Sequence, residues 1–493
     1  MSRVFVLLVL AVITRPTLAG EFDPIDAFVR QQMKAVGIPG MAVAIVKDGK
    51  IVYMTGYGES SPGVPITPQT PFMLASISKS FTAMAVMQLV EVGKINLDNP
   101  VKQYLTRLHF ADEEAAGRIT VRQLLHQISG FSTLSGRKHF FSRDVGQEAL
   151  ERGVRDNADE WLTASPGEKF QYSNVNYNMA ALIVSEVSGM PFEQYVREKI
   201  YAPLKMTNSF TNEADAKMHG LTVGHRFWFG YPVAANDIPY SHTDLGAGGL
   251  FSSAEDLALY TLSNLGDESG KAVLSPAGFA ELHKPGFHIL RDIHYGLGWF
   301  VIRKPGEHLV WHRGDMVCFH TDIMLAPDER IGVVVLINAN SPSKGVQLIN
   351  VAEGVFGLAR GKEPHVFKND PVPNIVMYAI LALIFLQLFW MVRTVRKVRC
   401  WKRYPELRPK RWKMWMGVIV SIILNLAIAS AIFVVLPAVF EIPYSAIYLF
   451  MPDAFWVATI CGGIALFWVV VRNVLVVLGF SIAVQNAAAS KTS

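Results

Sequence analysis

Hydrophobic residues follow helical and strand spacing over the first three quarters of the chain and form long unbroken runs in the last quarter. Residues 24–36 carry apolar side chains at helical spacing, and the strand-like runs 41–46 and 51–55 flank Asp48-Gly49, a pair suited to a tight hairpin. The pattern also predicts helices near residues 121–127, 179–187, 254–262 and 345–355, and strands at residues 309–312, 319–325 and 331–337. Strands at both ends with helices between them predict an α/β fold, in which one antiparallel sheet carries a helical insertion.

Three apolar runs near the end are each about long enough to cross a membrane, at about residues 375–392, 414–437 and 454–471. Ten Lys or Arg residues and one acid, Glu406, lie between the first two runs. Because basic loops stay in the cytoplasm, we expect this loop and the C-terminus inside and the first part of the chain outside. The formal net charge of +5 is then a feature of membrane topology and gives no indication of nucleic-acid binding.

The N-terminus predicts export. Residues 1–19 contain Arg3, a short apolar run and the small-residue end Thr17-Leu18-Ala19, which are typical of a cleaved signal peptide; an uncleaved anchor is the alternative. The expected organisation is a signal peptide over residues 1–19, a globular domain over 20–361, a linker over 362–374 and a membrane region over 375–493. We expect a multi-pass protein of the inner or cytoplasmic membrane, with its first domain periplasmic or extracellular.

The candidate chemistry begins at Ser76-Ile77-Ser78-Lys79, which places a hydroxyl and an amine one helical turn apart. Apolar residues then recur at helical spacing up to Gly93, a residue type that often ends a helix. Two other Ser-x-x-Lys sequences start at Ser135 and Ser341, but neither heads an uninterrupted apolar helix pattern. Ser76 and Lys79 are therefore the favoured pair.

Two further tripeptides complete a set. Tyr172-Ser173-Asn174 precedes a predicted helix, and His312-Arg313-Gly314 ends a strand-like run, whereas the competing His294-Tyr295-Gly296 lies beside a glycine-rich bend. The three motifs occur in a fixed order: Ser-x-x-Lys, then Tyr-x-Asn, then a basic residue-x-Gly on the last strands. This order is a far more specific sign of a catalytic site than any one motif.

With these motifs the chain resembles the penicillin-recognising serine hydrolases, in the branch of class C β-lactamases, D-alanyl carboxypeptidases and related esterases. The resemblance covers about residues 23–360 and implies the β-lactamase/transpeptidase-like sheet flanked by helices. Supporting stretches are Ile119–Leu125, Pro203–Met206, Gly246–Leu250 and Tyr295–Trp299.

The resemblance also implies roles for individual residues. Ser76 would be the nucleophile, Lys79 its base and Tyr172 a proton relay to the leaving group. Asn174 would hydrogen-bond substrate or Lys79. The backbone N–H groups of Ser76 and Asp315 would form the oxyanion hole.

Substrate would also contact His312, Arg313 and Gly314, and here the chain departs from the family pattern. His312 stands where many lactamases have Lys, and Arg313 where a hydroxyl is usual. Arg313 is expected to bind an acidic group of the substrate bidentately, or else to face solvent or pair with Asp315. The three-helix tail is similar to that of peptidases that remove an N-acyl-D-asparagine group in colibactin biosynthesis, and to membrane-anchored penicillin-binding-protein-like hydrolases.

The sequence thus predicts a membrane-anchored, exported serine hydrolase that forms an acyl-enzyme on a peptide, amide or ester. The alternatives are a D-alanyl carboxypeptidase, an esterase, a β-lactamase, or a sensor that is acylated without turnover. Neither a cofactor nor a metal is expected. The expected partners are the small-molecule substrate and the lipid bilayer, without nucleic acid; a membrane transporter partner stays open.

Overall fold

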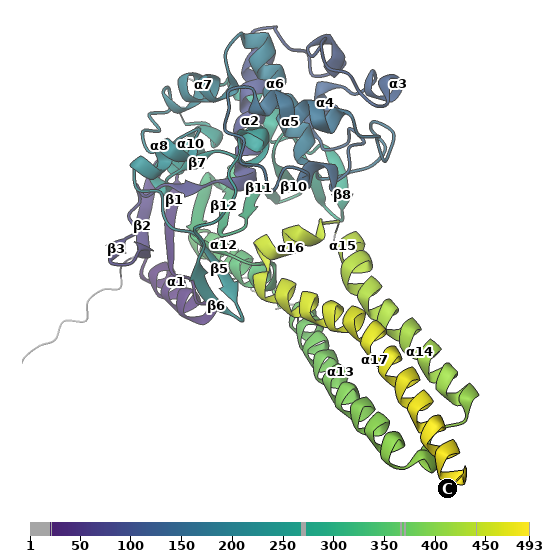
Figure 1. Ribbon diagram of the computed structural model, residues 1–493. Helices are drawn as coiled ribbons and strands as arrows, with labels where there is room; N and C mark the ends of the chain where they lie inside the picture. Colours follow the sequence, from purple (N-terminus) through teal and green to yellow (C-terminus); the bar gives the residue numbers. More distant parts are fainter. Residues whose placement is uncertain are drawn as a thin grey trace, which may run out of the picture.

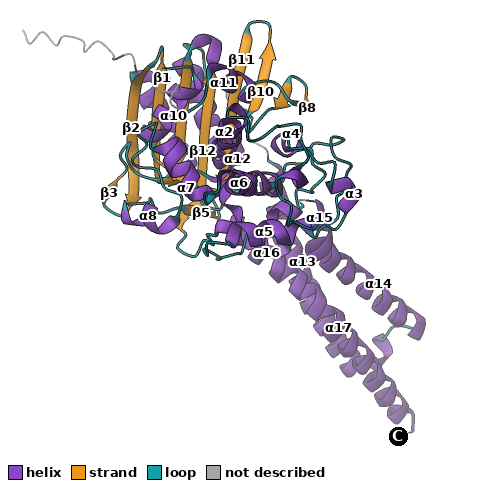
Figure 2. Ribbon diagram, turned by 90° about the horizontal axis from the view of Figure 1, so that it is seen from above, coloured by secondary structure: helices purple, strands orange, loops and turns teal. Residues whose placement is uncertain are grey.

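The largest sheet joins the two ends of the globular part of the chain (Figures 1 and 2). The computed structural model describes residues 20, 22–267, 273–364, 367–368, 371–439 and 441–492, so the expected signal peptide lies outside the described residues. Within them the sheet has nine strands in the order β3-β2-β1-β13-β12-β11-β10-β9-β8. Its strands are β1 (Gly40–Lys47), β2 (Lys50–Ser61), β3 (Val64–Pro65), β8 (Phe287–Leu290), β9 (Ile293–Tyr295), β10 (Phe300–Lys304), β11 (Glu307–Met316), β12 (Phe319–Ala326) and β13 (Ile331–Ile337).

The predicted hairpin and its place in the sheet are confirmed. Asp48 and Gly49 have φ angles of 49° and 76°, which suit the two central residues of a type I′ turn. β1 pairs antiparallel with β13, with Met41 opposite Ile337, so an N-terminal strand lies between β2 and the C-terminal strands. The three strands at one end of the sheet, β10, β9 and the edge strand β8, were not predicted.

The position of β1 between two layers explains why its sequence is apolar without interruption. Ala42 and Ala44 face the helical layer that contains the larger core, whereas Met41 and Val43 face the opposite layer. α1 (Asp23–Val36) and α12 (Gly345–Ala359), both predicted, form that opposite layer. A strand covered on both faces needs apolar side chains at every position.

Two helices form the centre of the helical layer: α2 (Ser78–Glu91), buried over most of its length, and α6 (Asn174–Ser188). The other helices are η1 (Ala75–Ile77), η2 (Val101–Gln103), α3 (Glu113–Ala116), α4 (Val121–Leu125), η3 (Ser135–Arg137), α5 (Ala149–Ala158), α7 (Phe192–Val196), η4 (Arg197–Tyr201), α8 (Glu213–Met218), η5 (His242–Asp244), α9 (Leu245–Gly248), α10 (Ala254–Asn264), α11 (Pro276–Leu282), η7 (Pro327–Glu329) and η8 (Pro342–Lys344). The short strands are β4 (Phe72–Met73), β5 (His225–Trp228), β6 (Tyr231–Ala234), β7 (Phe251–Ser252) and β14 (Ala339–Asn340).

A helical tail follows the globular part and extends away from it (Figure 1). Within the described residues three helices are long and apolar enough to cross a membrane, over Asn374–Arg403, Arg411–Val439 and Pro452–Gln485. The tail consists of α13 (Val372–Arg403), η9 (Pro405–Leu407), α14 (Arg411–Ser430), η10 (Ala431–Val435), α15 (Leu436–Val439), α16 (Tyr444–Phe450) and α17 (Pro452–Thr492). The chain therefore combines a sheet-and-helix globular part with three candidate membrane spans.

Candidate active site

Ser76 lies in a sharp turn at the N-terminus of α2. Ala75, the residue before it, has a φ of 48°, a left-handed conformation that costs a residue with a Cβ roughly 1–2 kcal/mol. Hydrogen bonds at Leu74 hold this turn in place: its N–H donates to the Leu250 carbonyl at 2.8 Å, and its carbonyl accepts from the Thr321 hydroxyl at 2.9 Å. The structure thus ties the strained turn before Ser76 to the sheet on one side and to the α9–β7 segment on the other.

Lys79 is fully buried and lies beside Ser76. Its Nζ is 3.1 Å from Ser76 Oγ, 2.9 Å from Asn174 Oδ1 and 2.7 Å from the Ala247 carbonyl oxygen. Burial disfavours the charged form and lowers the pKa of Lys79 to about 7, against an opposing effect of Asp244. Near neutral pH a large fraction of Lys79 is therefore an uncharged amine in contact with a hydroxyl.

Tyr172, just before α6, covers the Lys79 amine. The amine lies 4.8 Å from the centroid of the Tyr172 ring. Burial, with the nearby Tyr295 and Asp315, raises the pKa of Tyr172 well above 10, while a hydrogen bond with Ser76 acts in the opposite direction. Tyr172 is therefore a neutral phenol at physiological pH, suited to donating a proton.

Three residues that support Lys79 were missed in the sequence. The Ala247 N–H donates to Asn178 Oδ1 at 3.1 Å, and Asn178 Nδ2 donates to Asp244 Oδ1 at 2.7 Å. This chain fixes the Ala247 carbonyl that accepts from Lys79. Asn178 follows Asn174 by four residues on α6 and so shares its helix face, which is the signal that could have identified it.

His312 is buried on β11 at the same site. Its Nδ1 is 2.7 Å from the Arg313 carbonyl and its Nε2 is 3.1 Å from the Tyr295 hydroxyl. Burial, with the nearby Lys79, lowers the pKa of His312 to about 3, so the imidazole is neutral. Tyr295, whose ring centroid is 6.2 Å from that of Tyr172, belongs to the motif that was set aside in the sequence, yet it lies at the site.

Gly314 lets β11 approach the Ser76 turn. A Cβ at Gly314 would collide with the Leu74 carbonyl oxygen and the Thr321 hydroxyl, so only glycine fits there. The structure therefore brings the strand that carries Asp315 next to the Ser76 turn. An oxyanion hole formed by the Ser76 and Asp315 N–H groups stays a prediction.

The expectation that Arg313 binds an acidic group of the substrate is wrong, because successive residues of a strand point to opposite faces. His312 faces the site, whereas Arg313 Nε is 2.9 Å from Asp322 Oδ1 and its Nη2 is 2.7 Å from Glu353 Oε1 on α12. His320 lies in the same layer, 2.7 Å from Asp315 and 2.8 Å from Asp322. Arg313 thus belongs to a network of charges behind the sheet, on the face away from Ser76.

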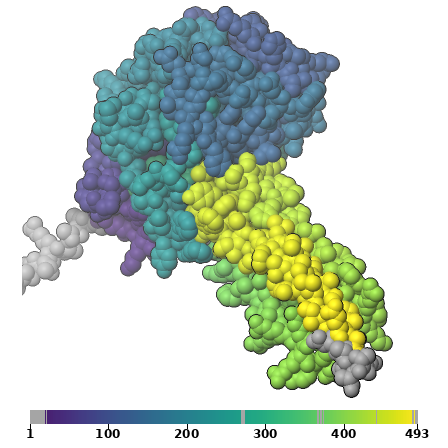
Figure 3. Space-filling view, viewed as in Figure 1, coloured from purple at the N-terminus to yellow at the C-terminus, as the bar shows by residue number. Residues whose placement is uncertain are grey.

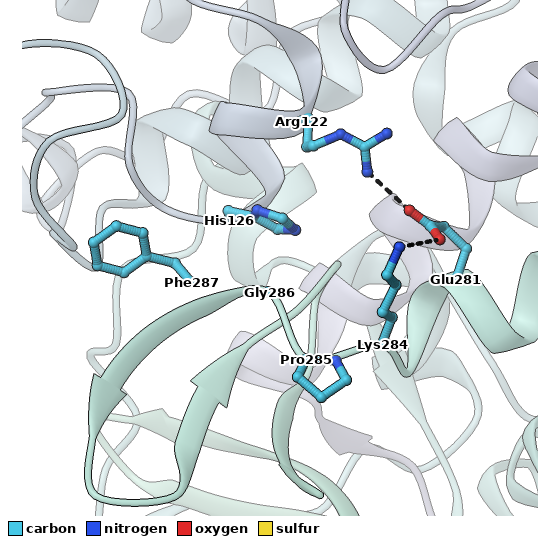
Figure 4. Close-up of a pocket in the computed structure, with 7 residues that line it drawn as sticks. All are labelled: Arg122, His126, Glu281, Lys284, Pro285, Gly286 and Phe287. Atoms are coloured by element: carbon cyan, nitrogen blue, oxygen red, sulfur yellow. Dashed lines mark hydrogen bonds and ion pairs between the residues drawn. The ribbon is translucent and has the colours of Figure 1, made fainter.

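A hollow of about 410 Å³ is lined by Arg122, His126, Glu281, Lys284, Pro285, Gly286 and Phe287 (Figure 4). Arg122 and Lys284 both pair with Glu281 there, at 2.8 and 3.6 Å. Burial lowers the pKa of the adjacent His126 to about 4. Asp98, which does not line the hollow, also pairs with Arg122 at 2.7 Å, so both cations of the hollow have a carboxylate partner. In the described ranges no group of three or more His, Cys, Asp or Glu side chains is placed to hold a metal ion.

Comparison with known proteins places the chain in a family. A family model described as Beta-lactamase matches residues 25–355, more than half of the chain. The chain belongs to the beta-lactamase family.

Curated relatives include Protein flp from Staphylococcus aureus (strain COL), which is 28% identical over 329 residues, covering 64% of this chain and 63% of the relative. Another is Unguisins hydrolase ungD' from Aspergillus campestris, which is 29% identical over 348 residues, covering 65% of this chain and 62% of the relative. The match thus spans less than two thirds of either relative's length.

Solved structures are similar in fold. An octameric penicillin-binding protein homologue from Pyrococcus abyssi has a TM-score of 0.61 and 28% identity, over 73% of this chain and 81% of its own. D-alanine carboxypeptidase AmpC from Burkholderia cenocepacia has a TM-score of 0.56 and 24% identity, over 68% and 99% of the two chains. These likenesses confirm the fold class expected from the sequence.

The depressed pKa of Lys79 predicts how acylation depends on pH. Below about 7 the amine is protonated and cannot accept a proton, so the rate of acylation by an ester should rise with pH through about 7 and then level off. Arginine stays charged, so Lys79→Arg should lower this rate about 10²–10⁴-fold. The rise of the acylation rate near pH 7, measured by stopped flow, should also disappear in this variant. Lys94→Gln, on the surface, is the control. An unchanged midpoint in Lys79→Arg would contradict this assignment.

The position of Arg313 predicts a loss of stability without a change in substrate recognition. Arg313→Thr leaves Asp322, which is buried, without one of its cationic partners, and should cost about 3 kcal/mol in the free energy of unfolding measured with urea. KM values for an acidic ester and a matched neutral ester should each change less than about twofold. A rise in KM confined to the acidic ester would restore Arg313 to the substrate site.

Proposed function

We propose that the protein is a membrane-anchored, exported hydrolase that cleaves acyclic amides, peptides or esters through an acyl-enzyme on Ser76. The observation that carries the proposal is the contact of the buried Lys79 amine with Ser76 Oγ at 3.1 Å. An amine with a pKa of about 7 is a competent base for a serine hydroxyl near neutral pH.

In the proposed acylation, Lys79 accepts the Ser76 proton while Ser76 Oγ attacks the substrate carbonyl. The backbone N–H groups of Ser76 and Asp315 stabilise the negative oxygen that develops. Tyr172 donates its proton to the leaving amine or alkoxide and is reprotonated from Lys79. The bond to the leaving group breaks, and the acyl group remains on Ser76.

Deacylation reverses the proton path. Tyr172, acting with Lys79, removes a proton from a water molecule, which attacks the acyl carbonyl. The tetrahedral intermediate then expels Ser76 Oγ, which regains a proton from Lys79. Each turnover consumes one water molecule and releases the acid and the protonated leaving group, and no cofactor takes part.

The neutral His312 supports an acyclic substrate. Many lactamases carry a lysine cation at this position, whereas His312 has a pKa of about 3 and Arg313 faces the opposite layer. A lactam carboxylate would therefore find no cation supplied by this tripeptide. Removal of an N-acyl-D-amino-acid group from a peptide or natural-product precursor fits this site, and a relative whose name is unguisins hydrolase supports a hydrolytic role.

A D-alanyl carboxypeptidase or an esterase would use the same residues, and the fold of a D-alanine carboxypeptidase supports the first. A sensor acylated without turnover is the rival from another class. The contacts of Lys79 with both Ser76 and Asn174 favour turnover. The connection between the first two apolar helices, residues 404–410, is also too short for an effector domain.

Loss of Ser76 should abolish both turnover and covalent labelling by a serine-directed phosphonate. Ser135→Ala and Ser341→Ala are matched controls, because each of these serines also precedes a lysine by three residues. Ser135 Oγ instead contacts Ser132 Oγ at 2.8 Å, and Ser341 Oγ contacts Ser343 Oγ at 2.9 Å. Labelling that survives in Ser76→Ala and disappears in a control would identify a different nucleophile.

The wild type should hydrolyse a chromogenic cephalosporin at least about tenfold less efficiently than a short-chain ester or an N-acyl-D-amino-acid amide. The physical reason is the missing cation, since an ion-assisted contact is worth about 1.5–3 kcal/mol. The measurement is kcat/KM for the three substrates under one set of conditions. Hydrolysis of the cephalosporin as fast as the ester would return the protein to the ordinary lactamases.

The orientation of the tail is also a proposal. Ten basic residues around the first connection favour a cytoplasmic loop, with the globular part on the other side of the membrane. Reporter fusions after Arg403 should report the inside and fusions after Tyr444 the outside. The reverse pattern would place Ser76 in the cytoplasm and contradict export.

A further inference from the structure

The connection between the second and third apolar helices lies against the globular part (Figure 3). This connecting segment, residues 441–453, contains α16 and joins α15 to α17. The Glu441 carbonyl accepts a hydrogen bond from Arg137 Nη1 at 2.7 Å. At the other end of α16, the Phe450 ring centroid is 5.6 Å from that of Phe140. Both contacts fall on residues 137–140 of the globular part.

A second set of contacts joins the connecting segment to the β5–β6 hairpin. The Arg226 guanidinium lies 5.6 Å from the centroid of the Tyr448 ring. The Phe229 N–H donates to Asp453 Oδ2 at 2.9 Å, and Asp453 is only 8% exposed. A buried carboxylate needs hydrogen bonds, and this one receives one from the globular part. The segment is therefore held by specific polar and aromatic contacts on two separate surfaces.

The first of these surfaces, residues 137–140, directly follows a residue that contacts the proposed active site. Gly136, next to Arg137 in η3, packs on the Tyr172–Asn174 turn: a Cβ there would lie 2.5 Å from the Asn174 backbone nitrogen and 2.8 Å from Ser173 Oγ. Asn174 Oδ1 in turn accepts from Lys79 at 2.9 Å. Contacts therefore run without a gap from the connecting segment to the amine beside Ser76.

We infer that the connecting segment is a docking element, through which the helical tail holds η3 against Asn174 and keeps Lys79 in position. The inference rests on the proposed function of Ser76 and Lys79. Arg137 is then a positioning residue, since it contacts the tail and not the substrate. Loss of its contact should slow the chemical step while leaving substrate binding nearly unchanged.

The test uses the full-length protein in phospholipid nanodiscs with a short-chain ester. Arg137→Gln should lower kcat about tenfold with KM within about twofold, the pattern for a group that acts on the reacting residues. Arg137→Lys keeps a donor for the Glu441 carbonyl and should recover most of kcat. Lys138→Gln is the matched control, because Lys138 bonds only inside the globular part in the contacts seen, to the Asp156 carbonyl at 2.8 Å and Glu160 at 3.1 Å.

A double-mutant cycle tests the docking from both sides. Phe140→Ala and Phe450→Ala should each lower kcat, and the double variant should lose no more than the larger single effect, because both remove the same contact. Equal kcat values in Arg137→Gln and Lys138→Gln, or independent effects of the two Phe variants, would overturn the inference. Ser76→Ala in the same nanodiscs separates the two claims: turnover that survives there refutes the proposed function itself.

Discussion

Burial of one amine is the constraint on which the rest of the site depends. Lys79 has no exposed surface, and the Tyr172 ring covers its amine. The amine donates hydrogen bonds to Ser76 Oγ, Asn174 Oδ1 and the Ala247 carbonyl, which replace the water that it loses on burial. Asp244 supplies a negative charge that limits the fall in its pKa. Without burial the amine would stay protonated at neutral pH and could not serve Ser76.

Much of this arrangement could be predicted from local sequence. Helical spacing after Ser76 placed that residue and Lys79 on one helical turn, and the Asp48-Gly49 turn and the apolar runs around it predicted the hairpin. The paired runs at both ends predicted the closure of the sheet by β1 and β13. The order of the motifs predicted that Tyr172 and Asn174 would lie near Lys79, because the family resemblance supplies the long-range contact that spacing alone lacks.

The features of the site that could not be predicted from the sequence depend on contacts between distant segments. The Ala247 carbonyl is a backbone group, so its residue type gives no signal, and Tyr295 is recognised only once β9 lies two strands from β11. Arg313 is different, since strand alternation already implied that it and His312 face opposite layers. The contacts of the connecting segment include the bond from Arg137 to the backbone carbonyl of Glu441, a pair that no sequence pattern joins.

The most direct test of the account is peptide mass spectrometry of the full-length protein, quenched with acid during turnover of a slowly released ester. The account predicts one acyl group on the peptide that contains Ser76, formed more rapidly at about pH 8.5 than at about pH 5.5, because Lys79 loses its proton near pH 7. An acyl group on another peptide, or formation on Ser76 at the same rate at both pH values, would contradict it.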